Sequence, residues 1–282
     1  MAYNQQQPGY YQPQGQNPYP QAPGWNTSGG EGYPQPNYAG AGSSNAHYAE
    51  GGVPKNEMGF NSQSIRAAFV RKVFTIVALM LGVVTFMCFI PYFHPPTMTL
   101  VQKNPALIFL GYAVFVVVYI ALVCCEGVRR SFPANIICTA ILTLAIGFMT
   151  MMITASYQTS SVFQCLLITT LCCGGIILFS MQTKYDITSC MGVIAIASMI
   201  IMIFGLISMV SLMAFPHVRF IHTIYAGAAA ILFMAYLAID IQMIMGGRRY
   251  EISPEDHIYA AVQLFMDIVQ IFWLLLSLFG NQ

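Results

Sequence analysis

The chain has 282 residues, of which 57% are hydrophobic and only 7% are charged, whereas about 25% of the residues in an average soluble domain are charged. So few charges cannot solvate a globular surface of this size, which disfavours a soluble enzyme or a secreted domain. The formal net charge of +1 also provides no basic field that would attract nucleic acid.

Residues 1–62 differ from the rest of the chain in composition. They are rich in Pro, Gln, Gly, Tyr and Asn, and they contain almost no Leu, Ile or Val. Such a segment cannot bury enough apolar surface to offset the entropy lost on ordering, so it predicts a disordered tail. The composition also fits a ligand for WW-type or SH3-type domains, although the tail has neither a PPxY motif nor an Arg-flanked PxxP motif. A solvated tether is the simpler interpretation.

Residues 63–282 have the pattern of one membrane domain. Apolar runs of about 20 residues follow one another between short polar breaks, and about 20 residues at a rise of 1.5 Å span the hydrocarbon core of a bilayer. There are seven such runs: Val73–Ile90, Ala106–Cys125, Ala134–Ile153, Val162–Met181, Thr188–Met213, Ile221–Met245 and Ile258–Phe279. The predicted fold class is therefore an all-α membrane protein with seven transmembrane helices in a lipid bilayer.

The distribution of Lys and Arg predicts the orientation of these spans. If the N-terminus lies in the cytosol and the spans alternate, only Lys103 and Arg219 of the eleven basic residues fall on the opposite side. Because cytosolic segments carry an excess of basic residues, we expect the tail to lie in the cytosol. Seven full spans then put the C-terminus on the opposite side.

Two carboxylates, Asp240 and Asp267, lie well inside apolar runs, where ionisable groups are costly and usually functional. The sixth and seventh spans run antiparallel around a cytosolic loop, and residue counts from that loop put the two acids within roughly 6 Å of the same depth. Two carboxylates at one depth cannot both ionise cheaply, so we expect them to share one proton. A nearby arginine would reverse this preference, and Arg129 and Arg130 at the end of the second span are the obvious candidates.

Three interpretations of this pair of acids remain open. The pair fits a titrating gate and cation site in a pore, because carboxylates suit Ca²⁺ and their protonation couples gating to pH. It fits the catalytic dyad of an intramembrane aspartyl protease poorly, because the Gly-x-Gly-Asp and Pro-Ala-Leu motifs are missing. In the third interpretation each acid bonds a backbone or side-chain group and only holds the bundle together.

Other residues carry weaker signals. No set of three His, Asp or Glu residues has metal-ligand spacing within the spans, which disfavours a zinc hydrolase, so we expect no enzymatic activity and no resident cofactor. Glu126 is expected to cap its helix end and to pair with Arg129 and Arg130. Ser253 and Pro254, followed by two acids, are typical of the first turn of a helix and predict the start of the last span.

Three stretches resemble the transmembrane Bax-inhibitor-motif proteins, and in particular their lifeguard branch, which includes the glutamate-receptor-associated proteins. They are Gly246–Asp256 (GGRRYEISPED), Ala260–Phe272 (AAVQLFMDIVQIF) and Cys124–Asn135 (CCEGVRRSFPAN). The Pro/Gln/Tyr-rich tail is similar to that branch as well. The resemblance covers about residues 63–282.

The resemblance implies a fold of six helices around a central seventh, calcium leak across internal membranes and suppression of cell death. It implies that Asp240 and Asp267 form a pH-responsive latch, and that Arg129 pairs with this latch when it is shut. Ile239 stands where the family often has Tyr, and Gln270 where it often has Asn, but both departures leave the acids intact.

The expected function is therefore a pH-sensitive calcium leak channel or leak regulator, with Ca²⁺ as the permeant ion. The expected location is the endoplasmic reticulum or the Golgi, with the plasma membrane as the other option. A different class of function is also open: a membrane scaffold that suppresses apoptosis by binding death receptors or Bcl-2-type proteins without conducting ions.

Overall fold

The computed structural model describes the backbone of residues 55–214 and 220–281, so the predicted disorder of residues 1–54 lies outside the described residues. Helices form all the regular structure in these two ranges. The α-helices are α1 (Lys55–Phe93), α2 (Pro95–Lys103), α3 (Leu107–Cys124), α4 (Glu126–Arg130), α5 (Ala134–Thr154), α6 (Thr159–Gln182), α7 (Met191–Ala214), α8 (Phe220–Met245) and α9 (His257–Phe279). Two short 3₁₀ turns, η1 (Ile187–Cys190) and η2 (Pro254–Asp256), precede α7 and α9.

The seven predicted spans and the all-α class are confirmed. Within the described ranges, seven helices are long and apolar enough to cross a membrane, and they match the seven apolar runs in order. In hydrocarbon every backbone N–H and C=O must be satisfied within its own segment, which is why apolar runs of this length fold as helices. The first helix begins at Lys55, so it includes residues 55–62, which the composition assigns to the tail.

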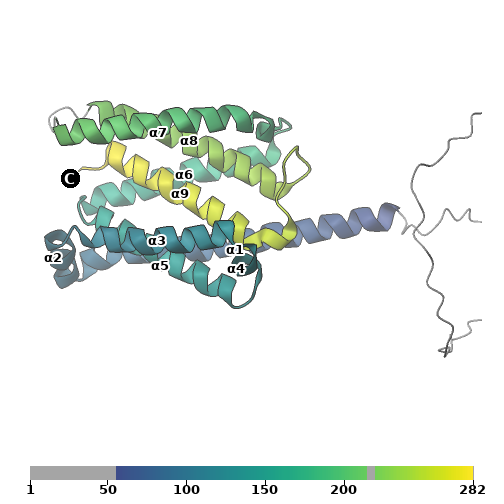
Figure 1. Ribbon diagram of the computed structural model, residues 1–282, viewed down its shortest axis with the longest axis horizontal. Coiled ribbons are helices and arrows are strands. Elements are labelled where there is room, and N and C mark those ends of the chain that lie inside the picture. Colours follow the sequence, from purple (N-terminus) through teal and green to yellow (C-terminus); the bar gives the residue numbers. More distant parts are fainter. Residues whose placement is uncertain (1–54, 215–219, 282) are drawn as a thin grey trace, which may run out of the picture. The chain divides into compact units, whose positions relative to one another are not determined.

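The last helix, α9, is the central helix of the bundle, as expected. It packs against α8, α1, α6 and α5, and in Figure 1 it crosses the middle of the view between α7 and α8 on one side and α3 and α5 on the other. Ala260, Ala261, Leu264, Phe265 and Leu276 of this helix are completely buried. A helix that is buried on so many sides needs apolar residues nearly all round, and the few polar residues of α9 are therefore conspicuous.

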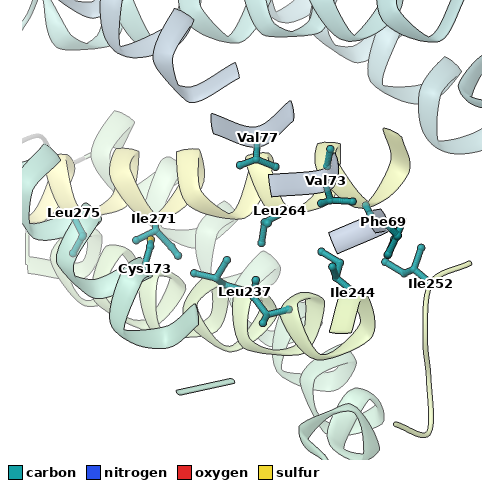
Figure 2. Close-up of a cluster of buried hydrophobic side chains, with 13 residues drawn as sticks. Phe69, Val73, Val77, Cys173, Leu237, Ile244, Ile252, Leu264, Ile271 and Leu275 are labelled. Carbon is teal, nitrogen blue, oxygen red and sulfur yellow. The ribbon is translucent and has the colours of Figure 1, made fainter. Parts of the chain in front are cut away.

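Apolar side chains from α1, α6 and α8 meet α9 in a large core cluster (Figure 2). Val73 and Val77 of α1, Leu237 of α8 and Cys173 of α6 lie around Leu264 and its neighbours on α9. This packing fixes the rotation of α8 and α9 about their axes. It therefore also decides which way the acids on these two helices point.

The loop between α8 and α9 is held by glycines and by Arg66 of α1. Gly246 and Gly247 both have positive φ, of 74° and 71°, a conformation that ends a helix and that other residues adopt at a cost. Arg66 donates hydrogen bonds to the carbonyl of Ile252 (2.7 Å) and to Glu251 (2.6 Å). The N–H of Gly247 and the charge of Arg66 hold the pKa of Glu251 below its usual range.

Candidate functional site

The acids of the sixth and seventh spans face each other. Asp240 of α8 and Asp267 of α9 are buried, with only 6% and 8% of their surface exposed. A hydrogen bond joins their carboxyl groups. A carboxylate has no proton to donate, so this bond requires one carboxyl group of the pair to be protonated. Oδ2 of Asp267 is buried and has no hydrogen-bond partner among the described residues. The pair thus offers a place for one shared proton, and it retains one oxygen that has no partner among the described residues.

Polar side chains form a stripe along the turn η2 and α9, and Asp267 of this pair belongs to it. The spacing of three or four residues keeps them within about 120° of one another around the helix axis. The stripe consists of Asp256, Tyr259, Gln263, Asp267, Gln270, Trp273 and Ser277.

Several members of the stripe have partners on the surrounding helices. The hydroxyl of Tyr119 on α3 donates to Gln263 (3.1 Å). Trp273 donates from Nε1 to Thr150 of α5 (3.0 Å), and a ring nitrogen of His222 lies 2.9 Å from the hydroxyl of Ser277. The stripe therefore connects α9 to α3, α5 and α8 through polar contacts.

Asp256, at the start of the stripe, binds both arginines that follow α3. Nε of Arg129 lies 3.1 Å from Oδ1 of Asp256, while Nε and Nη2 of Arg130 lie 2.8 and 2.9 Å from Oδ1 and Oδ2. Arg129 also donates to the carbonyl of Val123 (2.9 Å), and its guanidinium lies 5.3 Å from the ring centre of Tyr259. The hydrogen bonds that Arg130 donates to Asp256 raise the pKa of Arg130 further above its usual range.

Among the described residues, the ion pairs of Arg129 lie outside the predicted latch. The resemblance implies a pair between Arg129 and the latch of Asp240 and Asp267, but among the described residues the ion pairs of Arg129 are with Asp256 and Glu126. Asp256 lies in η2, directly before α9, and it binds Arg129. The pairing of Arg129 with the latch in a shut state stays a prediction. The sequence predicts that Glu126 pairs with Arg129 and Arg130. The pair with Arg129 is confirmed, at 3.5 Å, whereas the ion pairs of Arg130 among the described residues are with Glu255 and Asp256.

The described residues contain no group of three or more His, Cys, Asp or Glu side chains that could hold a metal ion. Asp186, in the loop before α7, also has several partners. It accepts hydrogen bonds from the hydroxyl and N–H of Thr188 and from the N–H of Arg249. These bonds, with the charge of Arg248, hold the pKa of Asp186 below its usual range.

Sequence reasoning missed the roles of Asp256, Tyr119 and Gln263. The signal that could have found two of them is the regular spacing of polar residues along the apolar run from residue 256 to residue 277, since a polar stripe on a buried helix needs partners. Tyr119 carries no comparable signal, because a single tyrosine in a lipid-facing helix is ordinary.

Sequence comparisons match most of this chain to known proteins. The family model described as inhibitor of apoptosis-promoting Bax1 matches residues 66–282. Protein lifeguard 3 from Homo sapiens is 38% identical over 223 residues, which cover 79% of this chain and 71% of that protein. Protein lifeguard 3 from Mus musculus is 36% identical over 223 residues, with 79% and 72% covered. Protein lifeguard 4 from Mus musculus is 26% identical over 217 residues, with 77% and 86% covered.

Proposed function

The chain belongs to the Bax inhibitor family, which implies an anti-apoptotic membrane protein, and we propose a more specific function. We propose that the protein acts as a pH-sensitive calcium leak channel, or as a regulator of such a leak. The observation that carries this proposal is the hydrogen-bonded pair of Asp240 and Asp267 inside the membrane domain. Suppression of cell death then follows from control of the calcium content of an internal membrane compartment.

Sensitivity to pH would arise from the single proton that the two acids share. With this proton, a hydrogen bond holds α8 to α9. Without it, two negative charges lie side by side in a region of low dielectric, where their repulsion is far stronger than in water. Loss of the proton therefore changes the force between α8 and α9, the two helices with the most extensive mutual packing.

A cation path would use the same oxygens. Carboxylate oxygens are ligands that Ca²⁺ prefers, and the unpartnered Oδ2 of Asp267 is available to an ion that passes the pair. Conduction requires binding weak enough for release, which two carboxylates provide better than a closed cage of acids. The polar stripe of α9 offers further oxygen atoms along the bundle.

Arg129 and Arg130 would keep the path shut by holding the segment after α3 against α9. Asp256 supplies the contact with both arginines. Tyr259 follows Asp256 and precedes Asp267 on the same polar stripe, and its ring centre lies 5.3 Å from the guanidinium of Arg129. A change of charge at Asp240 and Asp267 would thus change the electrostatic energy of Arg129 without a direct ion pair between them.

We place the end of the bundle that carries these arginines in the cytosol, and the protein in the endoplasmic reticulum or Golgi membrane. In support, several basic residues gather around the α8–α9 loop and its neighbours. Arg66 binds Glu251, Arg248 donates to the carbonyls of Thr183 and Lys184, and Arg130 binds Asp256. An excess of basic residues marks the cytosolic side.

Calcium flux into liposomes that contain the purified full chain tests the proposal. We expect the calcium flux of the wild-type chain to change with pH. We expect Asp240→Asn and Asp267→Asn each to abolish that change, because each variant leaves only one acid, and no proton can then be shared between two. Glu251→Gln is the matched control, since its carboxylate also lies in the α8–α9 loop but is 54% exposed and pairs with Arg66 rather than with Arg129 or Arg130. An unchanged pH response in both aspartate variants would refute the gate.

A scaffold that binds death receptors or Bcl-2-type proteins is the competing function. Deletion of residues 1–54, with assays of cell survival and calcium flux on the same variant, separates the two. If the deletion abolishes protection and leaves flux intact, the scaffold is favoured. If protection depends on Asp267 and not on the tail, the calcium leak is favoured.

A further inference from the structure

A lateral groove lies between α1 and α5, away from the aspartate latch. It has a volume of about 1020 Å³, which is at the upper end of the roughly 300–1,000 Å³ typical of small-molecule sites. Arg71, Lys72, Arg130 and His257 line it at the level where α9 begins. From Lys72 to Val83, its deepest residue on α1, the groove extends about 16 Å at 1.5 Å per residue. This is about half the hydrocarbon thickness of a bilayer.

The walls of the groove are chemically apolar. Three threonines line it, but their hydroxyls are already used: Thr75 donates to the carbonyl of Arg71 (2.8 Å), Thr139 to that of Asn135 (2.7 Å) and Thr143 to that of Thr139 (2.8 Å). The deeper part is lined by Leu79, Val83 and Leu144, which are 67%, 41% and 54% exposed. An apolar chain, rather than a polar solute, therefore fits this space.

Some of the residues that line the groove on both helices are small. Ala68 and Thr75 lie on α1, and Ala140 and Thr143 lie on α5. Longer side chains at these positions would fill the gap between the two helices.

The mouth of the groove is positively charged. Arg71 and Lys72 are exposed, and among the described residues neither forms an ion pair. The acids nearby are already bound: Asp256 and Glu255 pair with Arg130. The two α1 cations therefore stand uncompensated at the point where the apolar groove meets the aqueous interface.

We propose that this groove binds an anionic glycerophospholipid, with the headgroup phosphate at Arg71 and Lys72 and an acyl chain between α1 and α5. Basic pockets between transmembrane helices are suited to anionic headgroups, and the depth of the groove matches one leaflet. The two uncompensated cations distinguish this site from a surface that only contacts bulk lipid.

Competitive retention of two lipids tests the site. The full chain is purified after exposure to equal amounts of phosphatidylserine and phosphatidylcholine, and bound lipid is counted by native mass spectrometry. We expect selective retention of phosphatidylserine by the wild-type chain. We expect R71Q/K72Q to retain it roughly 30-fold less well, since each basic residue near the surface contributes about a factor of five.

Two controls separate the groove from general effects of charge and size. K103Q removes a basic residue at the end of α2 and leaves the groove intact, so retention should not change. A140F fills the groove and should lower retention, whereas A195F adds the same ring to an exposed position on α7 and should not.

Photo-crosslinking of the wild-type chain by phosphatidylserine with a photoactivatable acyl chain gives an independent measurement that needs no variant. We expect adducts on the groove residues of α1 and α5. Equal retention of the two lipids, full retention in R71Q/K72Q, or adducts confined to other helices would each overturn the proposal.

Discussion

Alanine at Gly246 should destabilise the protein more than alanine at the neighbouring Gly247. Both glycines have positive φ, so either substitution costs about 1–2 kcal/mol of backbone strain. A Cβ at Gly247 has no neighbour within 4 Å, whereas a Cβ at Gly246 would overlap the guanidinium of Arg66. Arg66 must then move and lose its hydrogen bonds to Ile252 and Glu251.

The size of the difference follows from those two bonds. A hydrogen bond to a charged group contributes about 1.5–3 kcal/mol, but Glu251 is 54% exposed, and exposed ion pairs contribute only about 0–1 kcal/mol. We therefore expect Gly246→Ala to cost about 2 kcal/mol more than Gly247→Ala. At about 2–4 °C per kcal/mol for a domain of this size, the two midpoints of thermal unfolding should differ by about 4–8 °C.

The midpoint of thermal unfolding is measured in detergent for both purified variants. The same two substitutions are then measured in an Arg66→Ala background. Without the guanidinium, Gly246→Ala and Gly247→Ala should cost the same, because only backbone strain remains. Equal costs in the wild-type background would refute the reasoning. So would a difference that persists after Arg66 is removed.

Three further predictions concern polar contacts between helices and loops. Gln242→Leu should lower the free energy of unfolding by about 2–4 kcal/mol in denaturant titrations, because Gln242 is 1% exposed and binds two backbone groups of the loop before α7, both at 2.8 Å. Trp273→Phe should cost about 1 kcal/mol by losing the bond to Thr150, and the same substitution in a Thr150→Val chain should cost less. The partners of Asp186 lower the pKa of this carboxyl group in the folded chain. The ionised Asp186 therefore stabilises the fold above the ordinary pKa near 4, and this stabilisation is lost as pH falls through the lower pKa of the folded state. Unfolding midpoints measured from neutral to acidic pH should therefore fall less steeply for Asp186→Asn than for the wild type.

The helical spans were predictable because the signal for them is local. A run of about 20 apolar residues needs no knowledge of its neighbours to be recognised, and the seven runs correspond to the seven helices. The start of the last helix was also accessible, since the hydroxyl of Ser253 accepts from the N–H of Glu255 as an N-cap should. The sequence did not reveal that one 3₁₀ turn, η2, separates this cap from α9.

The candidate site could be predicted from the sequence only in part, because its contacts join residues that are far apart in the chain. Counting residues from a loop gives the depth of Asp240 and Asp267, but packing of the apolar faces decides whether they point toward each other. The partner of Arg129 could not be read from depth at all. The chain turns at Cys125, where the backbone is extended, and this turn carries the arginines back to Asp256, which is 127 residues away in the sequence.

The position of α7 at the margin of the bundle affects how freely its sequence can change. Its extensive packing is with α8 and with the adjoining turn η1, and most of its long side chains, such as Val193, Met199 and Leu206, are more than half exposed. Lipid tails tolerate any apolar shape, so these outward positions constrain polarity and not volume. Over evolutionary time α7 should therefore exchange one aliphatic residue for another far more readily than α9, whose neighbours on every side fix both size and shape.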